Sequence, residues 1–354
     1  MRAVVVTGPG TLGPADVPDP VPGPDELLVQ VRAAGVNRAD LLQAAGHYPP
    51  PPGAPAWPGL EVSGTVLAAG ERVGPGWRPG DRVAALLVGG GYAERVAVPA
   101  GLALRVPDDV DLTDAAALPE ALATVWSMLI AARLVAGETL LVRGGSGGIG
   151  TVAVQLAAAL GARVVATAGG PRRCARVRAL GAHAVVDHRR PGFVESVRAA
   201  VAALDAETAP DAAQEGATGS APVGATRPAP PVPQNAGVDV VLDVLGAGGL
   251  ADNLAVLADD GRLAVIGLQQ GTRAELDLGL LLARRATVLG ATLRGRPLEQ
   301  RLAIVAAVRE HAWPMVADGR VRPVVHARLP LAQAGEAHRL MAAGEPFGKL
   351  LLLP

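Results

Sequence analysis

A glycine-rich stretch in the middle of the chain limits the possible folds more than any other feature. An apolar run at residues 139–143 leads into residues 144–150, where five of seven residues are glycine. An alanine-rich helical pattern follows at residues 151–160, and a second apolar run occupies residues 163–167. Strand, glycine turn, helix and second strand form the context in which G-x-G-x-x-G holds a pyrophosphate. The stretch therefore predicts dinucleotide binding in preference to a plain strand-to-helix turn.

Glycine has a physical purpose in such a turn. Without side chains, the turn can close tightly and its backbone N–H groups can approach a phosphate. The helix that follows adds partial positive charge at its N-terminus. The turn residues expected to contact the cofactor are Gly144, Gly145, Gly147, Gly148, Ile149 and Gly150.

The composition allows two domains of ordinary size and excludes several classes of function. Half of the 354 residues are apolar but only 2% are aromatic, so the cores must be mostly Ala, Val and Leu. A net charge of −1 gives no sign of nucleic-acid binding. The single cysteine, Cys174, excludes a disulfide framework and a Cys-rich metal site. Because neither a secretory signal nor a run of 18 apolar residues is present, we expect no membrane partner and a cytoplasmic location.

Short strand patterns before the turn predict a β-rich domain over residues 1–118. Glycines and prolines separate these patterns, as they do in all-β domains. The strand candidates are residues 1–7, 26–34, 59–70, 80–86 and 92–98. Helical spacing then occupies residues 113–134 and leads to the glycine turn.

After the turn, strand and helix patterns alternate, which predicts a parallel sheet covered by helices over residues 119–292. The remaining segment, residues 293–354, should return to the first domain through a last strand at 349–353. The expected elements are helices at 192–204, 250–257, 297–318 (interrupted at Pro314) and 332–343, and strands at 238–244, 261–267, 286–292, 321–327 and 349–353.

Residues 205–237 interrupt this alternation. They are rich in Ala, Pro, Gly, Thr and Gln, a composition that cannot bury enough apolar area to offset chain entropy. We expect a disordered surface insertion between a Rossmann helix and its next strand. The alternative is a proline-rich segment that docks a partner.

The residues after the second strand of the parallel sheet bear on the choice of cofactor. An NAD enzyme would have Asp or Glu there to bind the adenosine ribose. This chain has Ala168, Gly169, Gly170 and Pro171, followed by Arg172 and Arg173. No carboxylate repels a 2′-phosphate, and two guanidinium groups can pair with it. The pattern therefore favours NADPH over NADH.

Several motifs together resemble the zinc-free quinone-oxidoreductase branch of the medium-chain dehydrogenase/reductase superfamily, including its NADPH:quinone oxidoreductases of the zeta-crystallin type. The resemblance covers nearly the whole chain, and the motifs occur in the family's order. It implies an α/β protein in which a GroES-like β-rich catalytic domain is combined with a Rossmann domain, a doubly wound parallel sheet. The motifs are residues 37–41, 48–50, 59–64, 80–83, 91–94, 144–150 and 243–246.

The resemblance also implies an active site in the cleft between the domains. Its catalytic candidates are Asn37, Asp40 and Tyr48, which carry hydrogen-bonding groups able to orient an acceptor and stabilise charge on its oxygen. The alternative for Asp40 is a helix-terminal carboxylate, and for Tyr48 an aromatic residue packed on prolines. His188 stands where similar enzymes place a tyrosine on the 2′-phosphate.

The remaining cofactor contacts follow from the same resemblance and from the ends of the predicted strands, where ligands gather in open α/β sheets. Members of the family usually form homodimers through the edges of their Rossmann sheets, and residues 288–293 are the candidate edge here. The expected cofactor contacts are Asn37, Thr124, Gly169, Gly170, Asp243, Gly246, Gly267, Leu268, Gln269, Ala291, Thr292 and Leu293.

Zinc-dependent relatives have ligands that this sequence lacks. They carry cysteine in the segment occupied here by residues 35–38, and Gly-His-Glu where this chain has Gly59, Leu60 and Glu61. Leucine cannot bind a metal, and four thiolates cannot come from one cysteine. The six histidines are scattered without ligand spacing. We therefore predict no metal site.

Three functions remain open at this point. The first is zinc-independent transfer of hydride from NADPH to a quinone, a small-molecule substrate. The second is reduction of an enone or another activated alkene, which uses nearly the same chemistry. The third, from a different class, is a protein that holds NADPH without turnover, as a structural component or redox sensor.

Overall fold

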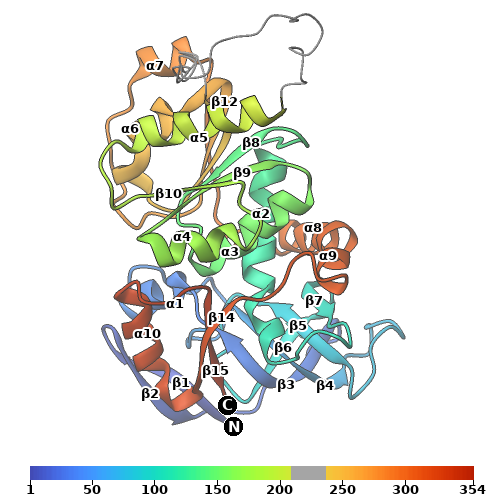
Figure 1. Ribbon diagram of the computed structural model, residues 1–354. Coiled ribbons are helices and arrows are strands. Elements are labelled where there is room, and N and C mark those ends of the chain that lie inside the picture. Colours follow the sequence, from blue (N-terminus) through green and yellow to red (C-terminus); the bar gives the residue numbers. More distant parts are fainter. Residues whose placement is uncertain (209–236) are drawn as a thin grey trace, which may run out of the picture.

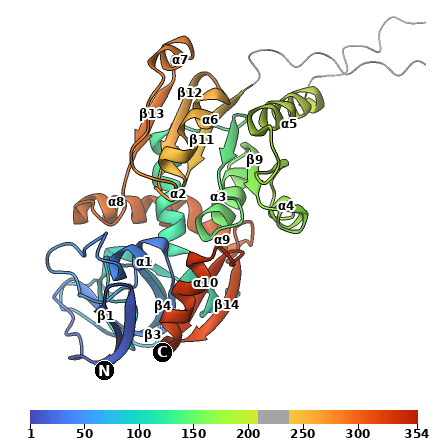
Figure 2. The same ribbon diagram turned by 90° about the vertical axis from the view of Figure 1, so that its left-hand side faces the viewer.

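The computed structural model describes residues 1–208 and 237–354, which form two lobes connected through the helix α2 (Pro119–Ala131) (Figure 1). Both ends of the chain lie in the lower lobe (Figure 2). Most of the segment 205–237 lies outside the described residues. The helix α5 continues to Thr208, so the expectation that helical structure ends before residue 205 was wrong by four residues.

The upper lobe contains a six-stranded parallel sheet in the order β10-β9-β8-β11-β12-β13. Chain order reverses between β8 and β11, and this reversal marks the edge where ligands bind in such sheets. The strands are β8 (Thr139–Val142), β9 (Arg163–Ala168), β10 (Ala184–Asp187), β11 (Val238–Asp243), β12 (Leu257–Val265) and β13 (Thr287–Gly290).

Both faces of this sheet are buried, as the unbroken apolar runs of its strands predict. In β8, Leu140 and Val142 belong to the core that includes α2 and α3, while Leu141 belongs to the core on the other face, with α5 and α6. Alternate residues of one strand thus pack against the helical layers on the two faces of the sheet, which is the doubly wound arrangement. The helices are α3 (Gly148–Ala159), α4 (Pro171–Arg178), α5 (Phe193–Thr208), α6 (Leu250–Ala255) and α7 (Leu278–Ala283).

The lower lobe contains a seven-stranded sheet in the order β14-β15-β3-β4-β5-β7, with β6 paired to β3, and a separate β1-β2 hairpin. Its strands are β1 (Arg2–Gly8), β2 (Thr11–Asp16), β3 (Glu26–Gly35), β4 (Glu61–Ala69), β5 (Arg82–Leu86), β6 (Arg95–Pro99), β7 (Ala103–Arg105), β14 (Val325–Pro330) and β15 (Lys349–Leu353).

The remaining helices belong to the lower lobe or to the junction, where α8 and α9 lie in both views (Figures 1 and 2). The α-helices are α1 (Arg38–Ala44), α8 (Leu298–Ala307), α9 (Trp313–Ala317) and α10 (Ala334–Ala342), with short 3₁₀ turns η1 (Ala100–Leu102), η2 (Asp114–Ala117), η3 (Gly246–Gly249) and η5 (Leu331–Gln333) and a π-helical turn η4 (Val308–Ala312).

The fold class predicted from the sequence is confirmed, and the differences are local. The strands β2 and β7 were not predicted. β14 begins at Val325 rather than at residue 321, because Pro323 has no N–H to donate to a sheet. The helical interruption predicted at Pro314 appears as the π-helical turn that ends two residues before it.

One helical segment, Asp114–Ala131, is long and apolar enough to cross a membrane by length and composition alone. Most of it is buried inside the protein, where α2 packs against α3 and the sheet of the lower lobe. Its apolar character is that of a core helix.

Two contacts connect the lobes near the glycine turn and at β13. The Gly348 N–H donates to the Ser146 carbonyl at 2.9 Å, directly before β15 enters the lower sheet beside β3. Arg294, which follows β13, donates from Nε to the Val88 carbonyl and from Nη2 to Gln43 Oε1, each at 2.7 Å. These contacts set how the two lobes lie against each other.

The glycine turn supplies the first prediction. A Cβ on Gly150 would lie 2.1 Å from the Gly144 carbonyl oxygen and 2.7 Å from the Gly145 Cα, so Gly150→Ala must push α3 away from the turn. We expect a loss of about 1–3 kcal/mol in the free energy of unfolding, measured by urea denaturation. Gly147→Ala is the control, because its Cβ would meet only the Gly144 oxygen at 3.6 Å and its φ of −81° suits any residue. Equal stability of the two variants would contradict this account.

Candidate active site

The glycine turn is attached to the neighbouring strand β9 by its own backbone. The Gly144 N–H donates to Thr167 Oγ1 at 2.9 Å, and the Gly145 N–H donates to the Thr167 carbonyl at 2.8 Å. Gly144 has a φ of +78°, which only glycine adopts easily. The first turn of α3 carries N–H groups that no carbonyl within the helix can accept, so the turn can bind an anion.

The next corner, between β9 and α4, is where a ribose would lie. The Gly170 and Arg189 N–H groups both donate to Asp187 Oδ1, at 2.9 and 3.0 Å. Asp187 therefore uses its carboxylate to order this corner. Arg172 is exposed, and its guanidinium has no partner within residues 1–208 and 237–354. The corner thus offers one cation without a partner among the described residues, and its contact with a 2′-phosphate stays a prediction.

The second predicted cation is already engaged. Arg173 Nη2 donates to the carbonyls of Gly344 and Glu345 at 2.9 and 2.5 Å, so this guanidinium faces the C-terminal segment. Its Nε and Nη1 donors have no partner among the described residues, so a phosphate contact of Arg173 stays a prediction.

Arg189 lies over the same corner instead. A Cβ on Gly169 would be 2.9 Å from Arg189 Nε and 3.1 Å from His188 Nε2, so both side chains lie against this glycine. Desolvation lowers the pKa of His188, with Arg189 among the cations that contribute. Arg189 was not predicted as a site residue, although the cationic run after Asp187 was a visible signal.

Asp243, at the end of β11, does not face the cleft. Its side chain is fully buried, and its two oxygens accept the N–H groups of Leu245 at 3.1 Å and Gly246 at 2.7 Å. Because both oxygens have partners, the expected cofactor contact of Asp243 is replaced by a loop-ordering role. Gly246 and Gly267 allow adjacent loops to pack closely, since a Cβ on Gly267 would lie 2.6 Å from the Val244 carbonyl oxygen.

The other residues predicted to contact the nicotinamide differ in how exposed they are. Leu268, Gln269 and Thr292 are exposed at the ends of β12 and β13, where a ligand can reach them. Leu293 packs its side chain in the main core, and the expectation that its segment passes near the nicotinamide stays a prediction. Thr124 and Ala291 are partly buried.

Asn37 lies at the centre of a buried polar cluster. Its Nδ2 donates to Glu61 Oε1 at 2.9 Å, and its Oδ1 accepts from Lys349 Nζ at 2.5 Å. Lys349 also forms an ion pair with Glu61, and both side chains are almost completely buried. Neither Lys349 nor Glu61 was predicted as a site residue, because their positions are 288 residues apart.

Asp40 lies behind this cluster. Oδ1 accepts the Gly59 N–H at 2.9 Å, while Oδ2 accepts the Asn37 N–H at 2.7 Å and the Tyr92 hydroxyl at 3.2 Å. Burial raises the pKa of Asp40 to about 6. With both oxygens occupied by the protein, Asp40 acts as the helix-terminal carboxylate that was the alternative interpretation.

Tyr48 forms the outer side of the cluster together with Arg294. The Arg294 guanidinium lies 5.2 Å from the centre of the Tyr48 ring, and its Nη1 donates to the Tyr48 carbonyl at 3.3 Å. Partial burial raises the pKa of the phenol. Its hydroxyl has no partner in the part of the chain that the structure describes, so it is available to a ligand.

The described residues contain no group of three or more His, Cys, Asp and Glu side chains that could hold a metal ion. Leu60 is buried in the core. Glu61, the neighbouring carboxylate, already binds the Lys349 ammonium. These residues do not fit a zinc ion.

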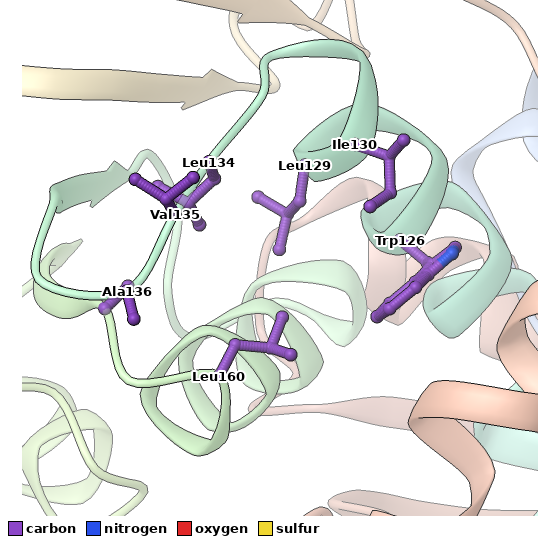
Figure 3. A pocket seen from close by; sticks show the side chains of 8 residues that line it. Trp126, Leu129, Ile130, Leu134, Val135, Ala136 and Leu160 are labelled. Atoms are coloured by element: carbon purple, nitrogen blue, oxygen red, sulfur yellow. The ribbon is translucent and has the colours of Figure 1, made fainter.

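An apolar pocket of about 120 Å³ lies elsewhere, between the end of α2 and the loops that lead into β8 and β9 (Figure 3). Its lining includes Trp126, Ile130 and Leu160. Because these loops precede the strands, the pocket lies at the amino ends of β8 and β9, opposite the glycine turn. It is therefore separate from the site.

Comparisons with known proteins agree with this architecture. Residues 23–108 match the alcohol dehydrogenase GroES-like domain, and residues 148–307 match the domain described as zinc-binding dehydrogenase. Human quinone oxidoreductase is 29% identical over 100% of this chain and 98% of its own length.

Two solved structures are similar along their whole length. Mycobacterial Rv1454c complexed with NADPH has a TM-score of 0.80 at 29% identity, and each chain is covered completely. A probable oxidoreductase from Mycobacterium abscessus has a TM-score of 0.75 at 33% identity, over 100% of this chain and 99% of that one. The chain is therefore an oxidoreductase of the medium-chain dehydrogenase/reductase superfamily.

Proposed function

We propose that this protein transfers hydride from NADPH to a quinone and does so without zinc. The observation that carries the proposal is the corner between β9 and α4, where the guanidinium groups of Arg172 and Arg189 have no hydrogen-bond or ion-pair partner among the described residues. The NADPH bound to the similar mycobacterial protein and the quinone-oxidoreductase relatives support it. Steady-state consumption of NADPH with a panel of quinones and a panel of enones tests it. Turnover only with enones favours the alkene-reductase alternative, and no turnover favours a binding protein.

The residues around the glycine turn fit a dinucleotide. The turn would hold the pyrophosphate through backbone N–H groups, and Arg172 and Arg189 would hold the 2′-phosphate. Asp187 lies nearby, but its charge is satisfied by two N–H groups rather than aimed at the ribose. When bound, NADPH supplies the hydride, and the protein orients the acceptor beside it.

Removing either free cation should weaken NADPH binding selectively. A charge-assisted hydrogen bond contributes about 1.5–3 kcal/mol, so Arg172→Ala and Arg189→Ala should each raise the Kd for NADPH roughly 10- to 100-fold. The Kd for NADH should stay within about twofold, as measured by nicotinamide fluorescence. Arg178→Ala, at the other end of α4, is the control and should change neither constant. Equal weakening of NADH binding would refute the assignment.

Tyr48 and Asn37 are the proposed acceptor-binding groups. The Tyr48 hydroxyl is free, and its position beside Arg294 places a hydrogen-bond donor at the outer side of the cluster. Asn37 is fixed by Glu61 and Lys349, so the donor it would offer an acceptor is the second Nδ2 hydrogen, which makes only a 3.5 Å contact with the Gly35 carbonyl. Both groups suit the stabilisation of charge that develops on an acceptor oxygen.

Because no metal takes part in this arrangement, a metal chelator should leave the rate of quinone reduction unchanged.

Tyr48→Phe should lower kcat/KM for the quinone about tenfold, because one hydrogen bond of about 1–1.5 kcal/mol is lost. The Kd for NADPH and the unfolding free energy should not change. Tyr92→Phe changes the only other tyrosine and is the matched control. It removes the hydroxyl that bonds to both Asp40 and His338 in the protein interior, so it should reduce stability by about 1–3 kcal/mol, although Asp40 keeps the Asn37 and Gly59 N–H groups. If Tyr48→Phe keeps full kcat/KM, Tyr48 has no part in the reaction.

We also propose that the protein forms a homodimer through β13, which is an edge strand of the upper sheet. Val288 on this strand is 41% exposed, and the neighbouring helix α7 exposes Leu278 and Leu282. Such an edge can pair with a second copy.

Val288→Lys should convert the dimer to a monomer, as measured by light scattering. Leu67→Lys, which is equally exposed on β4 in the lower lobe, should leave the mass unchanged, and a monomeric parent protein would exclude the proposal.

A further inference from the structure

Glu120, the second residue of α2, carries a carboxyl group without a function in the contacts described so far. Its backbone N–H donates to Glu61 Oε2 at 2.9 Å, which fixes the start of α2 against the polar cluster. Its own carboxyl forms no hydrogen bond or ion pair within residues 1–208 and 237–354. The residue as a whole is partly exposed, and its carboxyl lies among the groups of the polar cluster.

Charged and titratable groups from four other elements or loops surround this carboxyl. Glu61 faces it from β4, Asp40 from α1, Lys349 from β15 and Arg294 from the segment after β13. Tyr48 is also close enough for its pKa to respond to Glu120. Because Lys349 is already paired with Glu61, it offers Glu120 little compensating charge.

This environment favours the protonated form. Burial, and then the neighbouring Glu61, raise the pKa of Glu120 to about 8, although Lys349 and Arg294 act in the opposite direction. At neutral pH most molecules therefore carry an uncharged carboxylic acid at this position. An acid that is protonated at neutral pH and open to a ligand can act as a general acid.

We propose that Glu120 donates the proton that completes reduction of the acceptor, an inference that rests on the proposed function. Hydride from the reduced nicotinamide adds to the conjugated acceptor, and the electron pair displaced from its π system moves to the acceptor oxygen. The carboxyl O–H bond of Glu120 then breaks, and a new O–H bond forms on that oxygen. Water returns a proton to the glutamate, so each cycle consumes one hydride and one proton.

The other ionisable groups of the cluster are less suited to this step. Asp40 has both oxygens occupied by N–H and O–H donors of the protein. Glu61 is held by Lys349 and Asn37. The raised pKa of Tyr48 favours hydrogen bonding over proton release. His338 lies behind Tyr92, and burial lowers its pKa to about 4, so it is uncharged.

The test compares Glu120→Gln with the parent protein across pH. The rate of the parent should fall as pH rises through about 8, because the acid is then ionised. Glu120→Gln should lower kcat by roughly 100-fold or more and remove this decline. Glu120→Asp keeps a carboxylic acid on a side chain that is one methylene shorter. It should therefore give an intermediate kcat and retain the fall in rate at high pH.

Glu299→Gln is the matched control, because Glu299 is likewise the second residue of a helix and is directly exposed to solvent. It should leave both kcat and the pH profile unchanged. Unfolding curves and the Kd for NADPH should be the same for all variants, which separates loss of the proton donor from loss of structure.

A second measurement does not depend on turnover. Infrared difference spectra of the protein without ligands should show a protonated carboxyl band that disappears between about pH 7 and 9 and is missing in Glu120→Gln. If the parent turns over quinone or enone but Glu120→Gln matches its rate and pH profile, the proton-donor assignment alone is wrong. A missing carboxyl band also overturns it. If the parent shows no turnover, the proposed function and this inference both fail.

Discussion

The buried ion pair between Glu61 and Lys349 is the interaction on which the site depends. Removing two charges from water costs several kcal/mol for each ion, and only good geometry with further hydrogen bonds offsets this cost. Here Asn37 forms hydrogen bonds with both partners, and the Glu120 N–H donates a hydrogen bond to the second Glu61 oxygen. The pair therefore orders the start of α1, the start of α2 and the start of β15 at one point.

The same pair bears on the state of the neighbouring acid. Glu120 lies next to Glu61 without an ion-pair partner among the described residues, and burial and the Glu61 carboxylate raise the pKa of Glu120 to about 8. The surroundings of a carboxyl group thus set its pKa.

Much of the fold could be predicted because its signals are local. The glycine turn, the apolar runs of β8, β9 and β11 and the helical pattern of α3 each lie within about ten residues, and each formed as expected. The site was predictable only in part. Lys349 and Glu61 meet across 288 residues, and nothing in the sequence pairs them. Asp243 has the right chemistry for a cofactor, but two backbone N–H groups already use both of its carboxylate oxygens.

The lower lobe is built from two distant segments, and this has a consequence for how the chain folds. β15 pairs with β3 through Leu351 and Gly35, and the complete upper lobe lies between them in the sequence. Closing so long a loop is slow and entropically unfavourable unless the intervening chain has already become compact. The upper sheet, whose strands follow one another within one continuous region, should therefore form early and bring the two halves of the lower sheet within reach.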